Sequence, residues 1–248
     1  MIKFVFIPHF AIRIVCAFIF FTVIGTLTHE FGHIAVAKYF GYETELHYGS
    51  MYYDYPDIEN DPLVVELKKN TQDNTEALKN KEDFEGMDRR KELFKILKEK
   101  YPYPKSHKAW ITFGGPAQTL LTSFLGLLIL FYRKSKEKEY FVIMDWIGVF
   151  FSLFALREIF NYLTVLFKTM LHGDVASKND EFKLSRYLDL NQWTIPTIAL
   201  IIGTVICLYV IFRVIPLKYR FTFLLSGFVG GILGFFIWLR WLGPLVLP

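Results

Sequence analysis

The sequence predicts an all-α polytopic membrane protein with a small extramembrane insertion that includes a short β-hairpin. Two observations carry this prediction. Hydrophobic residues make up 53% of the chain, and 26 of its 248 residues are Phe. The apolar residues also gather in stretches long enough to cross a hydrocarbon core, which takes about 20 apolar residues. A soluble globule of this size could not bury so much apolar surface, so we place the chain in a bilayer.

Five stretches are long and apolar enough to span a membrane. They cover residues 10–40, 109–132, 141–168, 193–213 and 221–241. A break of the first stretch at Gly25 would make six spans. No small-x-small cleavage site is clear in the first stretch, so we interpret it as an uncleaved anchor rather than a signal peptide. Cys16 and Cys207 fall inside the spans, so we expect them to act as small apolar residues and to form no disulfide.

Residues 41–108 form the largest polar insertion, between the first and second spans. Tyr42 to Tyr48 alternates in the period of a strand, which predicts a hairpin. Residues 63–100 are charge-mixed and rich in helix formers, so we expect one or two solvated helices there. We therefore interpret 1–248 as a single membrane-embedded domain that carries 41–108 as an extramembrane insertion.

The net charge of +4 is modest, and the basic residues lie mainly in loops. Membrane-flanking charge explains this pattern better than nucleic-acid binding does. The two short loops, 133–139 and 214–220, are basic. Their cations are Arg133, Lys134, Lys136, Lys138, Lys218 and Arg220. The positive-inside rule predicts that these loops and the N-terminus are cytoplasmic.

The sequence HEFGH at residues 29–33 is the motif that carries chemistry. Residues four apart project from one face of a helix, so His29 and His33 can ligate a single zinc ion. Glu30, one step round, reaches a zinc-activated water and serves as general base for peptide hydrolysis. Two histidines and a glutamate in or near hydrocarbon are costly unless they are used. The alternative is a set of polar residues that cap or cross a helix bundle.

HEFGH after an apolar helix, followed by AVAKYFG, resembles the site-2 protease class of intramembrane zinc metalloproteases. Enzymes of that class hydrolyse peptide bonds of membrane-anchored substrates. The resemblance implies Zn²⁺ as cofactor, His29 and His33 as ligands, Glu30 as catalyst and a membrane-anchored protein or peptide as substrate. It also implies a multi-pass protein of a bacterial cell membrane. The class holds its zinc nearer the cytosol, so the resemblance and the positive-inside rule disagree on orientation.

The third zinc ligand must come from another segment, because catalytic sites usually have three protein ligands and an open position. The class uses an Asp, and two candidates precede the fourth span: Asp174 in HGDVAS and Asp180 in NDEFKLSRYLDL. We choose Asp180, which resembles the Asp-led helix of bacterial members, with Asp174 as the alternative. The Asp-Gly dipeptide common in the class follows neither residue. A zincin-type site would instead use a glutamate, and Glu158 is the candidate for it.

The third span contains LREIFN, which places Arg157, Glu158 and Asn161 on a membrane helix. A charge inside a membrane span indicates function by default. We expect these residues to support the site. The alternatives are direct ligation by Glu158 and a structural pair in which Arg157 and Glu158 neutralise each other.

The second span opens with ITFGGPAQTLLTS. Gly114, Gly115 and Pro116 would let two backbones approach closely or let the helix bend. The run resembles the Gly-Pro-x-x-Asn element of the same class, and Thr119 stands where its Asn would be. A hydroxyl can still hydrogen-bond there. A simple packing notch between membrane helices is the alternative.

The candidate residues converge on one end of the spans. If the first helix enters the bilayer near Ala11, His29 lies about 27 Å along it, close to the far face. Asp180, Gly114 and Gly115 belong to segments at that face. The sequence therefore predicts a zinc endopeptidase with its site near one membrane surface. A transporter or ion path, a catalytically silent scaffold and a haem protein are the competing functions.

Overall fold

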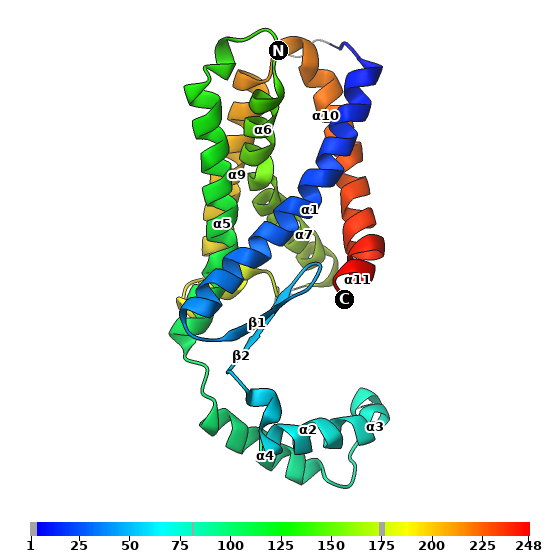
Figure 1. The fold of residues 1–248 in the computed structure, drawn as a ribbon, viewed down its shortest axis with the longest axis vertical. Coiled ribbons are helices and arrows are strands. Elements are labelled where there is room, and N and C mark those ends of the chain that lie inside the picture. The colour runs from blue at the N-terminus through cyan, green and yellow to red at the C-terminus, as the bar shows by residue number, and fades with distance from the viewer. Residues whose placement is uncertain (1–3, 81, 174–176) are drawn as a thin grey trace.

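The computed structural model describes residues 4–80, 82–173 and 177–248. Five of its helical segments are long and apolar enough to cross a membrane (Figure 1). Their bounds are Pro8–Tyr39, Lys105–Tyr132, Ile143–His172, Thr194–Val214 and Leu217–Val246. Each lies within a few residues of a predicted span. The predicted all-α fold with a small hairpin is confirmed.

Helix α1 (Pro8–Tyr39) is continuous through Gly25, so the six-span alternative is wrong. Pro8 suits the first turn, where its missing N–H leaves no bond unmade. The chain leaves the helix through Gly41, whose φ of 84° is a left-handed conformation that favours glycine. Helix α1 runs diagonally across the bundle and packs on α5 (Lys105–Tyr132) and α10 (Leu217–Phe236) (Figure 1).

The third span is divided. It consists of α6 (Ile143–Ser152), a 3₁₀ turn (Leu153–Ala155) and α7 (Leu156–His172). Helix α8 (Asp180–Tyr187) is short and packs on α5 and on α9 (Thr194–Tyr209). The last two spans end in π-helical turns, Val210–Val214 and Ile237–Leu242, and α11 (Gly243–Val246) follows the second.

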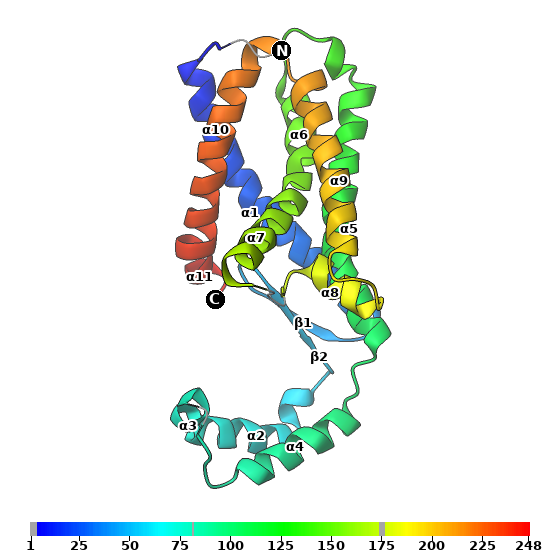
Figure 2. The same cartoon turned by 180° about the vertical axis from the view of Figure 1, so that it is seen from behind.

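The insertion begins with the predicted hairpin, β1 (Glu43–Leu46) paired antiparallel with β2 (Met51–Asp54). Its turn is fastened to the last span, because Trp238 Nε1 donates to the Tyr48 carbonyl at 2.7 Å. Three helices follow where one or two were expected: α2 (Pro62–Asp73), α3 (Thr75–Asn80) and α4 (Met87–Lys100). They form an arm set apart from the membrane-spanning helices (Figure 2).

Asp61 ties the two ends of this arm together. Its carboxylate accepts from the Leu63 N–H at 2.9 Å and so caps α2. It also accepts from Lys100 Nζ at 2.6 Å and from the Tyr101 hydroxyl at 2.7 Å, both at the end of α4. The hydrogen bond from Lys100 is the main reason why the pKa of Asp61 falls to about 2.

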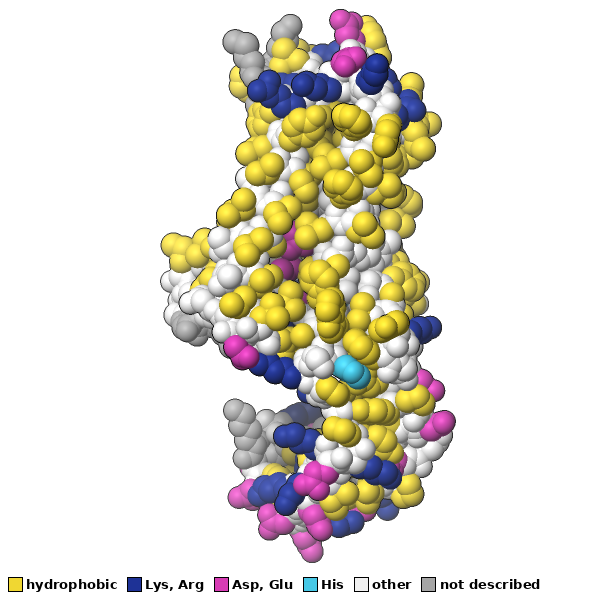
Figure 3. Space-filling model, turned by 90° about the vertical axis from the view of Figure 1, so that its left-hand side faces the viewer, with side chains coloured by type: hydrophobic (Ala, Val, Ile, Leu, Met, Phe, Trp, Pro, Cys, Tyr) yellow, Lys and Arg dark blue, Asp and Glu magenta, His cyan; other side chains and the backbone are white. Residues whose placement is uncertain are grey.

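The side-chain distribution fits a membrane protein. Figure 3 shows a broad hydrophobic band over the helical bundle, with most of the charged side chains at its two ends and on the insertion. A small group of acidic side chains is visible inside the band, at mid-height. Acidic groups at that depth are costly unless they are paired or used.

Candidate metal centre

Helix α1 buries the face that carries the HEFGH motif. His29 is fully buried, and Glu30 and His33 are 5% and 6% exposed. The two imidazole rings lie 4.9 Å apart between centroids, as the four-residue spacing predicts. Their burial shows that this part of α1 faces the other helices of the bundle rather than lipid.

The Nδ1 atom of each ring is held by helix α5. His33 Nδ1 lies 2.6 Å from the Ile111 carbonyl oxygen, and His29 Nδ1 lies 2.8 Å from Thr119 Oγ1. A carbonyl only accepts, so Nδ1 of His33 carries the proton and donates it. The Gly115 N–H is 3.2 Å from the same nitrogen, a longer distance that leaves this assignment unchanged. Both Nε2 atoms are left free to face Asp180, and they lie against the Gly115 backbone of α5.

Asp180, the first residue of α8, completes the group. Its Oδ2 lies 3.2 Å from His29 Nε2 and 3.3 Å from His33 Nε2. The three donor atoms all lie within 4.8 Å of one another. Donors around a tetrahedral zinc ion, with bonds of 2.0 to 2.2 Å, lie roughly 3.3 Å apart. The His-His-Asp set therefore has the donor chemistry and the spacing of a zinc site.

The Asp180 carboxylate is held in its charged form. Burial works against the charge, but the hydrogen bonds with His29 and His33 outweigh it and keep the pKa of Asp180 well below its usual range. Lys183 Nζ adds a contact of 3.2 Å to the other oxygen, Oδ1. A charged carboxylate is the form that binds a metal ion.

The approach of α1 to α5 depends on glycines. A Cβ built on Gly32 would lie 2.9 Å from the Gly114 carbonyl carbon, and one built on Gly114 would lie 2.9 Å from that of Gly32. A Cβ on Gly115 would lie 2.5 Å from His29 Nε2. The predicted close approach at Gly114 and Gly115 is thus present, and α5 continues through the neighbouring Pro116.

Helix α7 supplies side chains that contact Glu30 and helix α8 rather than the two histidines. Arg157 Nη2 lies 4.0 Å from Glu30 Oε1, so the described ion pair of Arg157 is with the motif glutamate and not with its neighbour Glu158. Asn161 Nδ2 donates to Glu181 Oε1 at 3.3 Å, directly after Asp180 in the chain. Glu158 is 2% exposed and its carboxyl group lies beside that of Glu181. Among the described residues, the donor group holds Asp180 and not Glu158.

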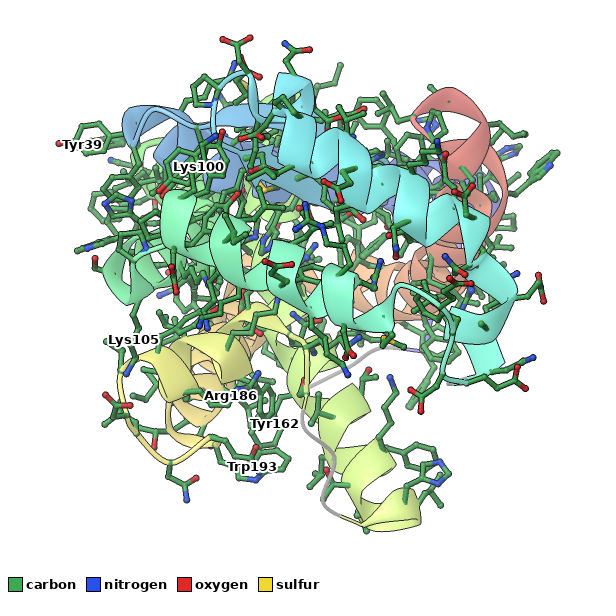
Figure 4. The ribbon with its side chains drawn as sticks, turned by 90° about the horizontal axis from the view of Figure 1, so that it is seen from below. Tyr39, Lys100, Lys105, Tyr162, Arg186 and Trp193 are labelled. Atoms are coloured by element: carbon green, nitrogen blue, oxygen red, sulfur yellow. The ribbon has the colours of Figure 1, made fainter. Side chains whose placement is uncertain are left out.

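Aromatic packing fixes α8 against α7 and α9. Figure 4 shows Tyr162, Arg186 and Trp193 together where the three helices meet. The Trp193 ring lies 5.4 Å from Tyr162 and 5.0 Å from Phe182. Arg186 donates to the Ser177 carbonyl at 2.8 Å, which fastens the chain just before Asp180. These contacts place Asp180 without any help from the sequence motif.

The alternative ligand Asp174 lies outside the described residues. Three neighbours of the site went unpredicted: the Ile111 carbonyl, Gly32 and Glu181. A backbone carbonyl has no sequence signature. Gly32, inside HEFGH, could have been recognised as the partner of the Gly114–Gly115 pair, and Glu181 as an acidic neighbour of the chosen ligand. We found no match to this chain among protein-family models, curated proteins or solved structures.

Proposed function

We propose that the chain is a zinc-dependent intramembrane endopeptidase. It would be a multi-pass protein of a bacterial cell membrane that hydrolyses peptide bonds of membrane-anchored proteins or peptides. His29, His33 and Asp180 would hold the zinc ion, and Glu30 would be the general base. The proposal rests on the geometry of the buried cluster and on the HEFGH motif, whose chemistry suits peptide hydrolysis.

One observation carries the proposal: the Nε2 atom of His33 faces a carboxylate. Because Nδ1 of His33 donates to the Ile111 carbonyl, Nε2 of the neutral ring holds a lone pair, and it lies 3.3 Å from Asp180 Oδ2. Two acceptors at this distance repel, so either a proton on Nε2, which makes the hydrogen bond described above, or a metal ion must lie between them. His29 Nε2 is turned to the same oxygen at 3.2 Å, so a shared metal ion satisfies both rings at once.

Zinc in this site would polarise the scissile carbonyl and lower the pKa of a water molecule. Glu30 would take the proton from a water molecule as the water oxygen bonds to the scissile carbonyl carbon. Glu30 then passes the proton to the amide nitrogen as the C–N bond breaks, so the products are a carboxylic acid and an amine. Arg157 Nη2 lies 4.0 Å from Glu30 Oε1, so its guanidinium can pair with the carboxylate that acts as the base.

An extended substrate fits the surroundings of the site. Strand β1 follows α1 by a short link, and α1 contacts both strands of the hairpin. Within the described residues, each strand pairs with one other strand, which leaves its outer edge open to a further strand. Such an edge can hold a peptide by strand addition, which presents an extended backbone to a nearby catalytic group.

Metal analysis of the purified chain, paired with a cleavage assay on a membrane-anchored reporter library, tests the proposal. We expect about one zinc per chain in the wild type and in Glu30→Gln, and loss of zinc in His29→Ala and in Asp180→Ala. Glu30→Gln should retain metal and lose cleavage. A Glu30→Gln variant with full activity would refute the mechanism.

Two other outcomes would favour other functions. Metal or proton uptake into sealed vesicles that depends on His29 and Asp180, without cleavage, would indicate an ion path. Zinc binding with neither cleavage nor uptake would indicate a catalytically silent scaffold.

A further inference from the structure

A groove opens on the surface at the other end of the helical bundle, far along α5 from the histidines. Its volume is about 580 Å³. Leu127, Leu128 and Phe131 of α5 line one side, and Tyr209 and Val214 line the other. Val214 is buried and belongs to the bundle core, so the groove reaches in from the surface to that core. Its walls suit a hydrocarbon chain.

The rim of this groove is basic. Lys134, Lys136 and Glu137 lie on it, which leaves a net charge of +1 from two lysines and one glutamate. Figure 3 shows Lys and Arg side chains gathered at this end of the molecule, directly above the hydrophobic band. Apolar walls below a cationic rim match the two parts of an anionic phospholipid: an acyl chain and a phosphate headgroup.

The four cations of the basic loop 133–139 fall into two groups. Arg133 Nε and Lys138 Nζ contact Asp145 Oδ1 at 2.9 and 2.8 Å, so both serve a fully buried carboxylate. Lys134 and Lys136 make no side-chain ion pair or hydrogen bond with any residue in the described part of the chain. The Asp145 contacts thus hold the loop while the two remaining lysines stay available at the rim.

The loop also fixes where its first lysine leaves the helix. Lys134 has φ 51° and ψ 38°, a left-handed conformation that a lysine rarely adopts. Its N–H donates to the Phe131 carbonyl at 2.9 Å, and Ser135 Oγ donates to Asp145 Oδ1 at 2.6 Å. A strained residue held by its neighbours on both sides indicates a constrained geometry rather than a loose surface loop.

We propose that this groove binds one anionic phospholipid, with an acyl chain between α5 and the end of α9 and the headgroup phosphate on Lys134 and Lys136. A lipid there would join α5 to the end of α9, and α8, which carries Asp180, packs on both helices. The proposal does not depend on the peptidase function or on which leaflet surrounds this end.

The test is native mass spectrometry of the full chain in detergent, titrated with dioleoylphosphatidylglycerol and, separately, with dioleoylphosphatidylcholine. We expect one tight site for phosphatidylglycerol and weaker binding of phosphatidylcholine. Lys134→Gln and Lys136→Gln should each weaken phosphatidylglycerol binding about five-fold, and the double variant about thirty-fold. Lys218→Gln is the control, because it removes one charge from the same end but lies outside the groove and over the Tyr140 ring.

A second variant tests the groove itself. Leu128→Trp fills it and should abolish the tight site while both lysines remain. Equal affinity for the two lipids, or unchanged affinity in the double lysine variant, would overturn the proposal. Unchanged binding in Leu128→Trp would overturn it as well, and so would a dimer that this variant dissociates, because the occupant would then be a second copy. Thermal melting of every variant verifies that each is folded.

Discussion

Thr119→Val tests how strictly α5 must hold the rings of His29 and His33 for the proposed zinc site. Thr119 is 1% exposed and its Oγ1 lies 2.8 Å from His29 Nδ1. Valine has nearly the same shape but leaves the buried imidazole nitrogen without a partner, at a cost of about 1 to 3 kcal/mol. Loss of a partner that orients a metal ligand typically lowers metal affinity by about 10- to 100-fold. We therefore expect zinc affinity to fall by about that factor while the helix content stays unchanged.

The assay is competition for zinc between the purified chain and a chelating dye, in detergent at neutral pH. Thr122→Val is the matched control, because Thr122 lies on the same helix and accepts from Gln118 Nε2 at 2.9 Å, away from the histidines. Its zinc affinity should equal that of the wild type. If Thr119→Val also binds zinc as tightly as the wild type, the Thr119 hydroxyl does not orient His29. The argument that α5 holds the rings for metal binding would then be wrong.

Two further predictions concern the close helix contact and the insertion. In Gly115→Ala the added Cβ would lie 2.5 Å from His29 Nε2, too close for either atom to stay in place. We therefore expect zinc content to drop from about one per chain toward zero by elemental analysis, with unchanged circular dichroism. A full complement of zinc in this variant would show that the rings can shift. In the insertion, Asp61 has its pKa lowered from 3.8 to about 2, so its contribution to stability is present above pH 3.8 and is lost as the pH falls through about 2. Hydrogen exchange at the start of α2 should follow that pH window in the wild type and show no such dependence in Asp61→Asn.

The membrane-spanning segments could be predicted well because hydropathy alone decides them. A span needs about 20 apolar residues whatever it packs against, and the start of α1 is set by a proline that the sequence displays. The helices of the insertion were harder to predict. Helix α3 has six residues and no buried side chain, so it leaves no periodic pattern.

The candidate site likewise contains residues that the sequence reveals and a residue whose position depends on packing. His29, Glu30 and His33 could be found from spacing, because helix geometry converts four residues into one shared face. The position of Asp180 beside them depends on aromatic contacts of Phe182 and Trp193, which no local pattern reveals. The choice of Asp180 over Asp174 came from a resemblance. Asp180 lies beside the two histidines, and Asp174 falls outside the described residues.

The contact of Gly32 with Gly114 has a consequence for recognising distant relatives. Gly32 fills one of the two positions that HExxH leaves open, yet any side chain there would force α1 and α5 apart. Chains that share this helix crossing should therefore read H-E-x-G-H, followed after a long insertion by G-G-P-x-x-T and later by D-E ahead of the fourth span. A pattern built from these three pieces describes a packing arrangement as well as the proposed chemistry, and it is more restrictive than HExxH alone.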